Sequence, residues 1–427
     1  MYENKEILCI MGLGYVGLPL AVEFSKHYNI IGFDINQERI AELQTNQDKT
    51  KTLSPEELIQ ANIKFTTDPK EIQNAQYVII AVPTPIDSAK HPDLTYLKKA
   101  SELVGRNIKE NTVVIYESTV YPGVTENICL PILEKESGIK LGQFGLGYSP
   151  ERINPGDTKH QLHNTIKIVS AHNADTLKKI SALYEKIIPA GLHKASSIKV
   201  AEAAKVVENV QRDMNIALMN ELSLIFHKLN IDTKDVLEAA GTKWNFHKYY
   251  PGLVGGHCIG VDPYYLAFQA LEHGYHPKII LSGREVNDYM AKHVAELAIK
   301  ELNNKGKVLK DCTVALLGLT FKENVTDLRN SRALNVIQYL KEYGINVITC
   351  EPNVSAETVK EKYGVDNLAF SNLPLCDSII IVNKHSQFKD LSIKDIKQKL
   401  RTHILIDTKR LFDKKEAEIQ GIVYRSL

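Results

Sequence analysis

Short apolar runs alternate with amphipathic helical patterns along both halves of the chain. The first half has four apolar runs, at residues 7–11, 30–34, 77–82 and 112–116, and a helical pattern that reaches residue 25. The second half repeats this order, with apolar runs at 313–317, 346–350, 378–382 and 403–406 and a helical pattern at 332–342. Apolar runs of this length between helical patterns predict parallel strands covered on both faces by helices.

A helical pattern at residues 198–229 separates the two halves and is longer than an ordinary globular helix. The predicted fold class is therefore α/β, with two doubly wound, Rossmann-like parallel-sheet domains joined by a central helical segment. We place the domains at residues 1–197, 198–300 and 301–427. The long helix is expected to bridge the two outer domains, and it could carry a dimer interface.

The amino-acid composition excludes several classes of protein. The 427 residues are 44% hydrophobic and 24% charged, and 52 Lys and Arg against 51 Asp and Glu leave a net charge of +1. This balance argues against a nucleic-acid or membrane-surface partner. No apolar run approaches the roughly 18 residues of a membrane span, so we expect a cytoplasmic protein. The six cysteines contain no CxxC pair, and no metal site is predicted.

The first apolar run leads into a GxGxxG motif made by Gly12, Gly14 and Gly17. A strand before the motif, a helix after it and Asp34 at the end of the next strand are typical of a dinucleotide site. Asp34 would bind a ribose 2′-hydroxyl and repel a 2′-phosphate, which favours NAD over NADP. Arg39 tempers this preference, since an arginine there could accompany either cofactor.

The late repeat lacks this glycine pattern and should not bind a dinucleotide in the same way. Lys322 and Arg329 instead follow its first strand, near the edge where open sheets hold ligands. Two cations at that edge suit a phosphorylated ligand, although solvated surface charges would give the same pattern.

The glycine-rich segment 251–265 contains Cys258, preceded by His257 and followed by Asp262. Its glycines allow the backbone to wrap a ligand, and its ionisable neighbours could tune the thiol. A single cysteine is more often structural than nucleophilic. A nicotinamide site combined with a cysteine nucleophile implies aldehyde-level chemistry through a thiohemiacetal and a thioester.

Lys205 and Asn209 lie four positions apart in the long helical pattern and therefore share a helix face. A cation and an amide donor side by side can stabilise an alkoxide or oxyanion. The alternative is a lysine on a solvated face.

These pieces, in order, resemble the UDP-glucose/GDP-mannose dehydrogenase family over essentially the whole chain. The motifs that carry the resemblance are GLGYVGLP at 12–19, VPTP at 82–85, ESTVYPG at 117–123, SPER at 149–152, the Lys205–Asn209 pair, the Cys258 loop and the segment from Phe321-Lys322 to Arg329. The resemblance implies a cytoplasmic homodimer that oxidises the C6 alcohol of a nucleotide sugar to a carboxylate, using two NAD⁺ in succession at one site. It also implies an N-terminal NAD domain, a central helical dimerisation segment and a C-terminal nucleotide-sugar domain.

The resemblance implies roles for individual residues. Cys258 would be the nucleophile, Lys205 and Asn209 would stabilise the oxyanion, and Asp262, Thr119 and Glu151 are the candidates that handle water and protons. The residues expected to bind NAD are Gly12, Gly14, Tyr15, Val16, Asp34, Arg39, Thr84, Ser118, Thr119 and Arg329. Those expected to bind the sugar nucleotide are Glu151, Lys205, Asn209, Gly255, Cys258, Lys322 and either Lys409 or Arg410.

The sequence HCIGVDPYY at 257–265 resembles the branch that acts on UDP-N-acetylhexosamines. We expect UDP-N-acetylglucosamine or UDP-N-acetylgalactosamine as substrate, in a pathway to capsule or O-antigen polysaccharide. UDP-N-acetylmannosamine and UDP-glucose remain alternatives. A two-electron hydroxyacid-type dehydrogenase and a non-catalytic NAD-binding protein are more remote alternatives, and the first would need neither the cysteine nor the second doubly wound domain.

Overall fold

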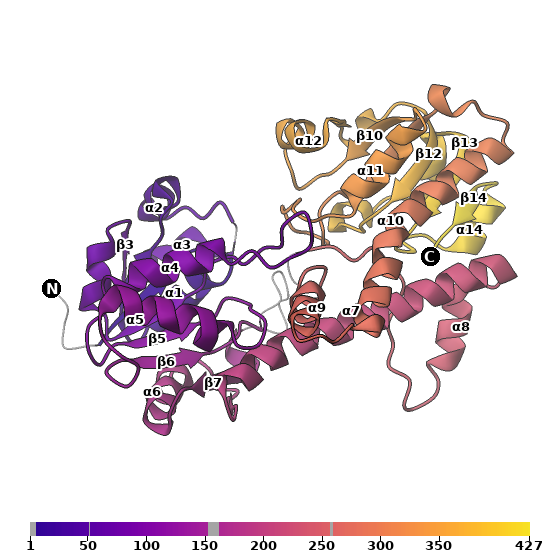
Figure 1. Ribbon diagram of the computed structural model, residues 1–427. Helices are drawn as coiled ribbons and strands as arrows, with labels where there is room; N and C mark the ends of the chain where they lie inside the picture. The colour runs from indigo at the N-terminus through magenta and orange to yellow at the C-terminus, as the bar shows by residue number, and fades with distance from the viewer. Residues whose placement is uncertain (1–5, 51, 153–161, 257–258) are drawn as a thin grey trace. The chain divides into compact units, whose positions relative to one another are not determined.

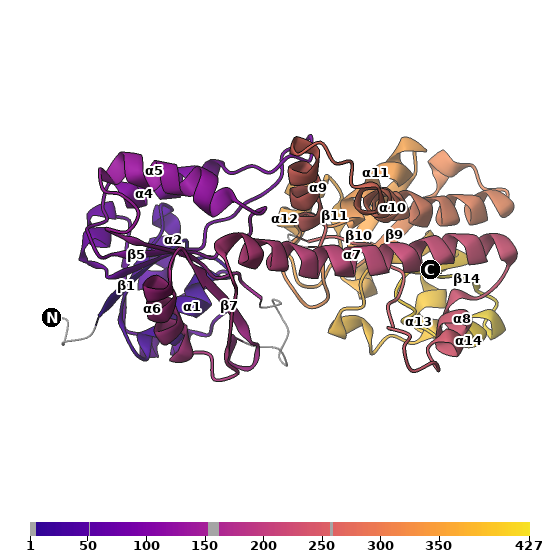
Figure 2. The ribbon, with the colours of Figure 1, turned by 60° about the horizontal axis from the view of Figure 1, so that its bottom comes forward.

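The computed structural model describes residues 6–50, 52–152, 162–256 and 259–427. The chain divides into two compact units, one made of residues 1–208 and 264–276 and the other of residues 209–263 and 277–427 (Figure 1). The helix α7 (Ile198–Leu229) is continuous and contributes to both units (Figure 2). The two α/β units and the long helix confirm the predicted fold class.

The first unit contains an eight-stranded sheet in the order β3-β2-β1-β4-β5-β6-β7-β8. Strand β7 pairs with β6 in the antiparallel sense, and the other described pairs are parallel. The strands are β1 (Ile7–Met11), β2 (Asn29–Phe33), β3 (Ile63–Thr66), β4 (Tyr77–Ile80), β5 (Val113–Tyr116), β6 (Gly145–Tyr148), β7 (Lys167–Ala171) and β8 (Leu192–Lys194). The helices are α1 (Gly17–Ser25), α2 (Gln37–Gln44), α3 (Pro55–Gln60), α4 (Thr95–Gly105), α5 (Leu130–Ser137) and α6 (Ala174–Glu185), with α9 (Asp262–Glu272) beginning in the other unit.

The second unit contains a six-stranded parallel sheet in the order β11-β10-β9-β12-β13-β14. Its strands are β9 (Thr313–Leu317), β10 (Asn346–Cys350), β11 (Asp366–Asn367), β12 (Cys376–Ile381), β13 (Leu400–Asp407) and β14 (Val423–Arg425). Its helices are α8 (Thr233–Ala240), α10 (Lys278–Asn304), α11 (Ala333–Glu342), α12 (Ala356–Tyr363), α13 (Ile393–Gln398) and α14 (Lys414–Ile419).

Alternate residues of β9 enter two different cores, which explains why this strand is apolar throughout. Val314 and Leu316 pack in one cluster with residues of α10 and α11. Ala315 and Leu317 pack on the opposite face, in a cluster that includes Ile393 of α13. Because both faces are covered, the ligand-accessible part of such a sheet is the edge at the carboxyl ends of its strands.

Candidate active site

The glycine motif forms a tight turn between β1 and α1. Gly12 has a φ of +93°, which a residue with a side chain rarely adopts. A Cβ at Gly17 would lie 1.9 Å from the carbonyl oxygen of Gly12, whereas the space around Gly14 is open to 4 Å. The turn therefore requires its first and third glycines for packing, while the second leaves room for a pyrophosphate to approach the backbone.

Asp34 lies beside this turn at the end of β2. Its Oδ2 accepts a hydrogen bond from the Leu13 N–H at 2.9 Å, and its Oδ1 accepts one from the Asn36 N–H at 2.9 Å. These two bonds fix the carboxylate next to the glycine turn. A negative charge held there suits a ribose hydroxyl and opposes a 2′-phosphate.

Arg39 forms ion pairs with two nearby carboxylates. Its guanidinium lies 2.6 Å from Glu42 and 2.8 Å from Asp48. Burial opposes the charge of Asp48, but hydrogen bonds from Thr50, Thr52 and Arg39 outweigh it and lower the Asp48 pKa to about 2. With its charge compensated by two carboxylates, Arg39 is poorly placed to attract a 2′-phosphate.

Three residues expected at the NAD site meet where β4 and β5 end. The Thr84 hydroxyl donates to the Thr119 carbonyl oxygen at 2.7 Å, and the Ser118 hydroxyl donates to the Val82 carbonyl oxygen at 2.7 Å. Since β4 and β5 run parallel to β1, these residues share the sheet edge of the glycine turn. Hydroxyls, backbone and the glycine turn thus line one edge, as a dinucleotide site requires.

The loop after Thr119 is anchored by Glu202 of α7, a residue that the motif analysis did not single out. The Glu202 carboxylate accepts hydrogen bonds from the N–H groups of Gly123 at 2.5 Å and Thr125 at 2.9 Å. Burial raises the Glu202 pKa to about 7. Glu202 therefore ties the Thr119 loop to the helix turn that precedes Lys205.

Glu151 lies beside a buried lysine that the motif analysis also missed. Lys167 Nζ is 3.9 Å from Glu151 Oε2 and 2.8 Å from Glu117 Oε2, and all three residues are buried. The Tyr184 hydroxyl also donates to Glu117. Burial raises the Glu117 pKa, and the negative charge of Glu151 raises it further. The positive charge of Lys167 lowers it, but the net effect is a raised pKa. One ammonium thus serves two carboxylates, an arrangement that can hold or move a proton.

The pair Lys205 and Asn209 lies on one face of α7, as the spacing predicts. Asn209 Nδ2 donates to Asp262 Oδ2 at 2.6 Å, and both side chains are buried. Asp262 is the first residue of α9. The structure therefore joins two of the expected catalytic residues, which are far apart in the sequence, in one direct contact.

Buried polar side chains hold the segment that precedes Cys258. The Asn220 side chain bonds to both backbone groups of Gly252. Its Oδ1 accepts from the Gly252 N–H at 2.8 Å, and its Nδ2 donates to the Gly252 carbonyl oxygen at 3.0 Å. Arg332 donates to the Val254 carbonyl oxygen at 2.9 Å. Asn220 is itself bonded to Asn287 of α10 at 2.7 Å. The backbone at 252–254 is therefore fixed from two directions.

The next two residues must be glycine. A Cβ at Gly255 would lie 2.7 Å from the Asn330 carbonyl oxygen, and one at Gly256, whose φ is +91°, would lie 2.8 Å from the Phe321 ring. His257 and the expected nucleophile Cys258 lie outside the described residues. The segment before Cys258 thus packs directly against the loop that carries Lys322.

Of the two candidate cations after β13, Arg410 is engaged elsewhere. Its guanidinium donates to the Leu427 carbonyl oxygen at 3.0 Å and lies 2.9 Å from Asp232. Lys409 Nζ would lie 3.9 Å from a Cβ placed on Gly252, and burial lowers the Lys409 pKa. Of these two candidates, Lys409 is thus the one near the glycine segment. Arg329 forms an ion pair with Asp327 at 2.7 Å.

The match to known families follows the same order as the two units. Models of the UDP-glucose/GDP-mannose dehydrogenase family match in three parts: the NAD binding domain over residues 6–188, the central domain over 199–289 and the UDP binding domain over 315–414. The chain belongs to this family. It is therefore an NAD-dependent nucleotide-sugar dehydrogenase, which confirms the resemblance, the enzyme class and the cofactor.

Relatives in the family match over nearly the whole chain. Protein CapL of Staphylococcus aureus is 48% identical over 99% of this chain and 100% of its own. The UDP-N-acetyl-D-glucosamine 6-dehydrogenase of Pseudomonas aeruginosa is 49% identical over 97% of this chain and 99% of its own. The structure of UDP-D-ManNAc dehydrogenase from Pyrococcus horikoshii superposes with a TM-score of 0.89 at 28% identity, covering 98% of both chains.

Three further observations concern the described part of this dehydrogenase. Its five described cysteines are buried and free, and burial raises the pKa of Cys9, Cys129 and Cys350 to about 12, so these thiols are poor nucleophiles. No three His, Cys, Asp or Glu side chains in this part come together as a metal site. Nor does any helix there combine the length and apolar character needed to cross a membrane.

Proposed function

We propose that this dehydrogenase oxidises the C6 alcohol of UDP-N-acetylglucosamine or UDP-N-acetylgalactosamine to the uronic acid, for surface polysaccharide biosynthesis. The observation that carries the proposal is the buried bond between Asn209 and Asp262, four residues after Cys258. The 49% identity to a UDP-N-acetyl-D-glucosamine 6-dehydrogenase supports the choice of sugar.

The proposed reaction proceeds in two oxidations and a hydrolysis. When bound, NAD accepts a hydride in each oxidation. The carboxylate of Asp262 or Glu151 removes the proton of the C6 alcohol as the aldehyde forms, and the Thr119 hydroxyl would help to handle water and protons. The Cys258 thiolate then adds to the aldehyde carbon, and Lys205 and Asn209 stabilise the resulting oxyanion. Loss of the second hydride leaves a thioester, which water cleaves to the carboxylate and the thiol. The C6 carbon thus loses two hydrides, and its oxidation from alcohol to carboxylate removes four electrons.

The glycine turn, Asp34 and the hydroxyls of Thr84 and Ser118 fit the cofactor role on the geometry of the first sheet edge. We propose that Tyr15, Val16 and Arg329 also contribute there. Lys322 and Lys409 would bind the diphosphate of the sugar nucleotide, and Gly255 would pass close to the sugar. We favour Lys409 over Arg410 because Arg410 is bonded to Leu427 and Asp232.

The test of the proposal is a panel of UDP-sugars with NAD⁺ and purified protein. We expect kcat/KM for UDP-N-acetylglucosamine or UDP-N-acetylgalactosamine to exceed that for UDP-glucose by about a hundredfold. Burial of the acetamido methyl contributes part of this, and a polar group built for its amide would be left unpaired by UDP-glucose. Initial rates of NADH formation across the panel give the ratios directly.

Two results would contradict the proposal in different ways. If UDP-glucose were the best substrate, the sugar assignment would be wrong while the dehydrogenase chemistry stood. If each UDP-sugar consumed yielded one NADH instead of two, the chain would be a two-electron enzyme, and Cys258 would have no covalent role.

We further propose that two copies pair through α7. Leu218, Ile225 and Leu229 recur at spacings of seven and four along this helix, and each is at least 44% exposed. A second copy presenting the same stripe would cover these side chains in a self-complementary interface.

We expect a dimer in sedimentation velocity, and a monomer when Leu218 and Ile225 are both replaced by Glu. Exposed Ile419→Glu is the control and should leave the dimer intact; a monomeric wild-type protein would overturn this pairing.

A further inference from the structure

The second sheet repeats one hydrogen bond of the dinucleotide site in the first sheet. In the first unit the Leu13 N–H donates to Asp34, which follows β2. In the second unit the Leu319 N–H donates at 2.6 Å to Glu351, which follows β10. The acid that would face a ribose in a dinucleotide fold is therefore present in the second unit as well.

In the second unit a buried histidine bonds to this acid. His385 Nε2 lies 3.0 Å from Glu351 Oε2, and both side chains have no exposed surface. Glu351 Oε1 accepts from the Asn353 N–H at 2.8 Å. Burial opposes ionisation of Glu351, but the hydrogen bonds from His385, Leu319 and Asn353 lower its pKa. The acid is thus an internal anchor and not a ligand site.

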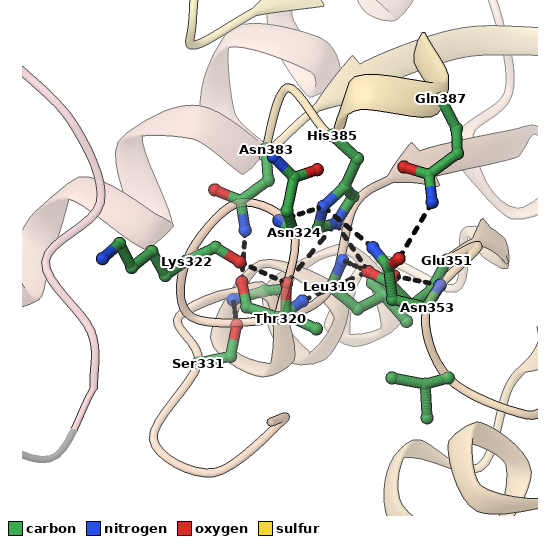
Figure 3. Close-up of polar contacts among 12 residues, drawn as sticks. Leu319, Thr320, Lys322, Asn324, Ser331, Glu351, Asn353, Asn383, His385 and Gln387 are labelled. Carbon is green, nitrogen blue, oxygen red and sulfur yellow. Dashed lines mark hydrogen bonds and ion pairs between the residues drawn. The ribbon is translucent and has the colours of Figure 1, made fainter. Parts of the chain in front are cut away.

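The backbone determines the tautomer of His385. Its Nδ1 lies 2.9 Å from the Asn324 N–H, which can only donate, so Nδ1 must accept. The proton of the neutral ring is then on Nε2, and it points at Glu351. His385 therefore connects Asn324 to Glu351, as Figure 3 shows.

These two residues hold the loop that carries Lys322 at both ends. Glu351 accepts from the N–H groups of Leu319 and Thr320, and His385 accepts from the N–H of Asn324. Within the loop, the Thr320 hydroxyl donates to the Lys322 carbonyl oxygen at 2.7 Å. The Lys322 side chain extends away from this cluster (Figure 3).

We propose that His385, Glu351 and Thr320 are positioning residues that fix Lys322 for the diphosphate of the UDP-sugar. The inference rests on the proposed role of Lys322 in substrate binding. A cation held by a rigid loop loses less conformational freedom on binding a phosphate than a cation on a mobile loop. The bonds at 319, 320 and 324 supply that rigidity.

The experiment measures binding of UDP and, separately, of NAD⁺ by titration calorimetry on the full chain. Lys322→Ala sets the loss of UDP affinity that removal of the cation causes. We expect Thr320→Val and His385→Ala each to weaken UDP binding about tenfold, and Thr320→Ser to restore it. NAD⁺ binding should be unchanged. Gln387→Ala, an exposed member of the same cluster, is the matched control and should keep wild-type UDP affinity.

A double variant separates positioning from general loss of structure. If His385 acts through Lys322, His385→Ala combined with Lys322→Ala should bind UDP no more weakly than Lys322→Ala alone. Additive losses would overturn the inference, as would wild-type UDP affinity in Thr320→Val. If His385→Ala fails to fold, Thr320→Val carries the test. Unchanged UDP affinity in Lys322→Ala would instead refute the substrate role of Lys322, and the inference with it.

Discussion

Cys258→Ser should abolish completed oxidation, lowering kcat roughly a thousandfold or more. A thiolate is readily formed near neutral pH and leaves readily from a thioester, whereas a serine hydroxyl is neither ionised nor a good leaving group. Wild-type enzyme should release two NADH and one carboxylate for each UDP-sugar, with no free aldehyde. The assay compares NADH yield with carboxylate yield at complete conversion.

A buried cysteine offers the matched control. Cys350→Ala removes a thiol at the end of β10 whose pKa burial raises to about 12, so it should retain the wild-type stoichiometry. Wild-type turnover in Cys258→Ser would discard the covalent mechanism. Loss of activity in Cys350→Ala with unchanged thermal stability would show that a thiol other than Cys258 takes part.

The sequence predicts the long and strongly periodic elements well. The predicted bounds 198–229, 313–317 and 346–350 agree with α7, β9 and β10. It misses β6, whose four residues include two glycines and so lack the apolar pattern of a strand. Gly147 is a packing requirement, since a Cβ there would lie 2.7 Å from the Ser170 carbonyl oxygen of β7 and 2.2 Å from the end of the Ile180 side chain of α6. A contact with a helix that comes later in the chain has no local signal.

The same limit applies to the site. The family resemblance assigns Thr84, Ser118 and Thr119 to the NAD site, and parallel-sheet topology brings these residues together because they follow β4 and β5. Glu202 and Lys167 were missed because a charged residue usually lies at the surface, and their burial depends on partners distant in sequence. A signal does exist at Lys167, which begins an apolar strand. A charged residue inside an apolar run is worth testing for a buried partner.

Asp262→Asn should lower kcat by about 10²- to 10⁴-fold while leaving the KM for the UDP-sugar within a fewfold of wild type. Asparagine keeps the size of aspartate, but its amide cannot accept the proton of the alcohol or of the attacking water. Asp262 Oδ2 already accepts from Asn209 Nδ2 at 2.6 Å, which orients the carboxylate. Asp235→Asn, an exposed carboxylate on α8, is the matched control.

The pH–rate profile of this variant distinguishes a base from a mere structural contact. If Asp262 is the base, we expect an acidic limb in the wild-type profile and its loss in Asp262→Asn, because no carboxylate at that position remains to be protonated. A lower kcat with the acidic limb retained would give Asp262 an orienting role through Asn209 and leave Glu151, beside Lys167, as the proton acceptor. Wild-type kcat in Asp262→Asn would remove Asp262 from the chemistry altogether.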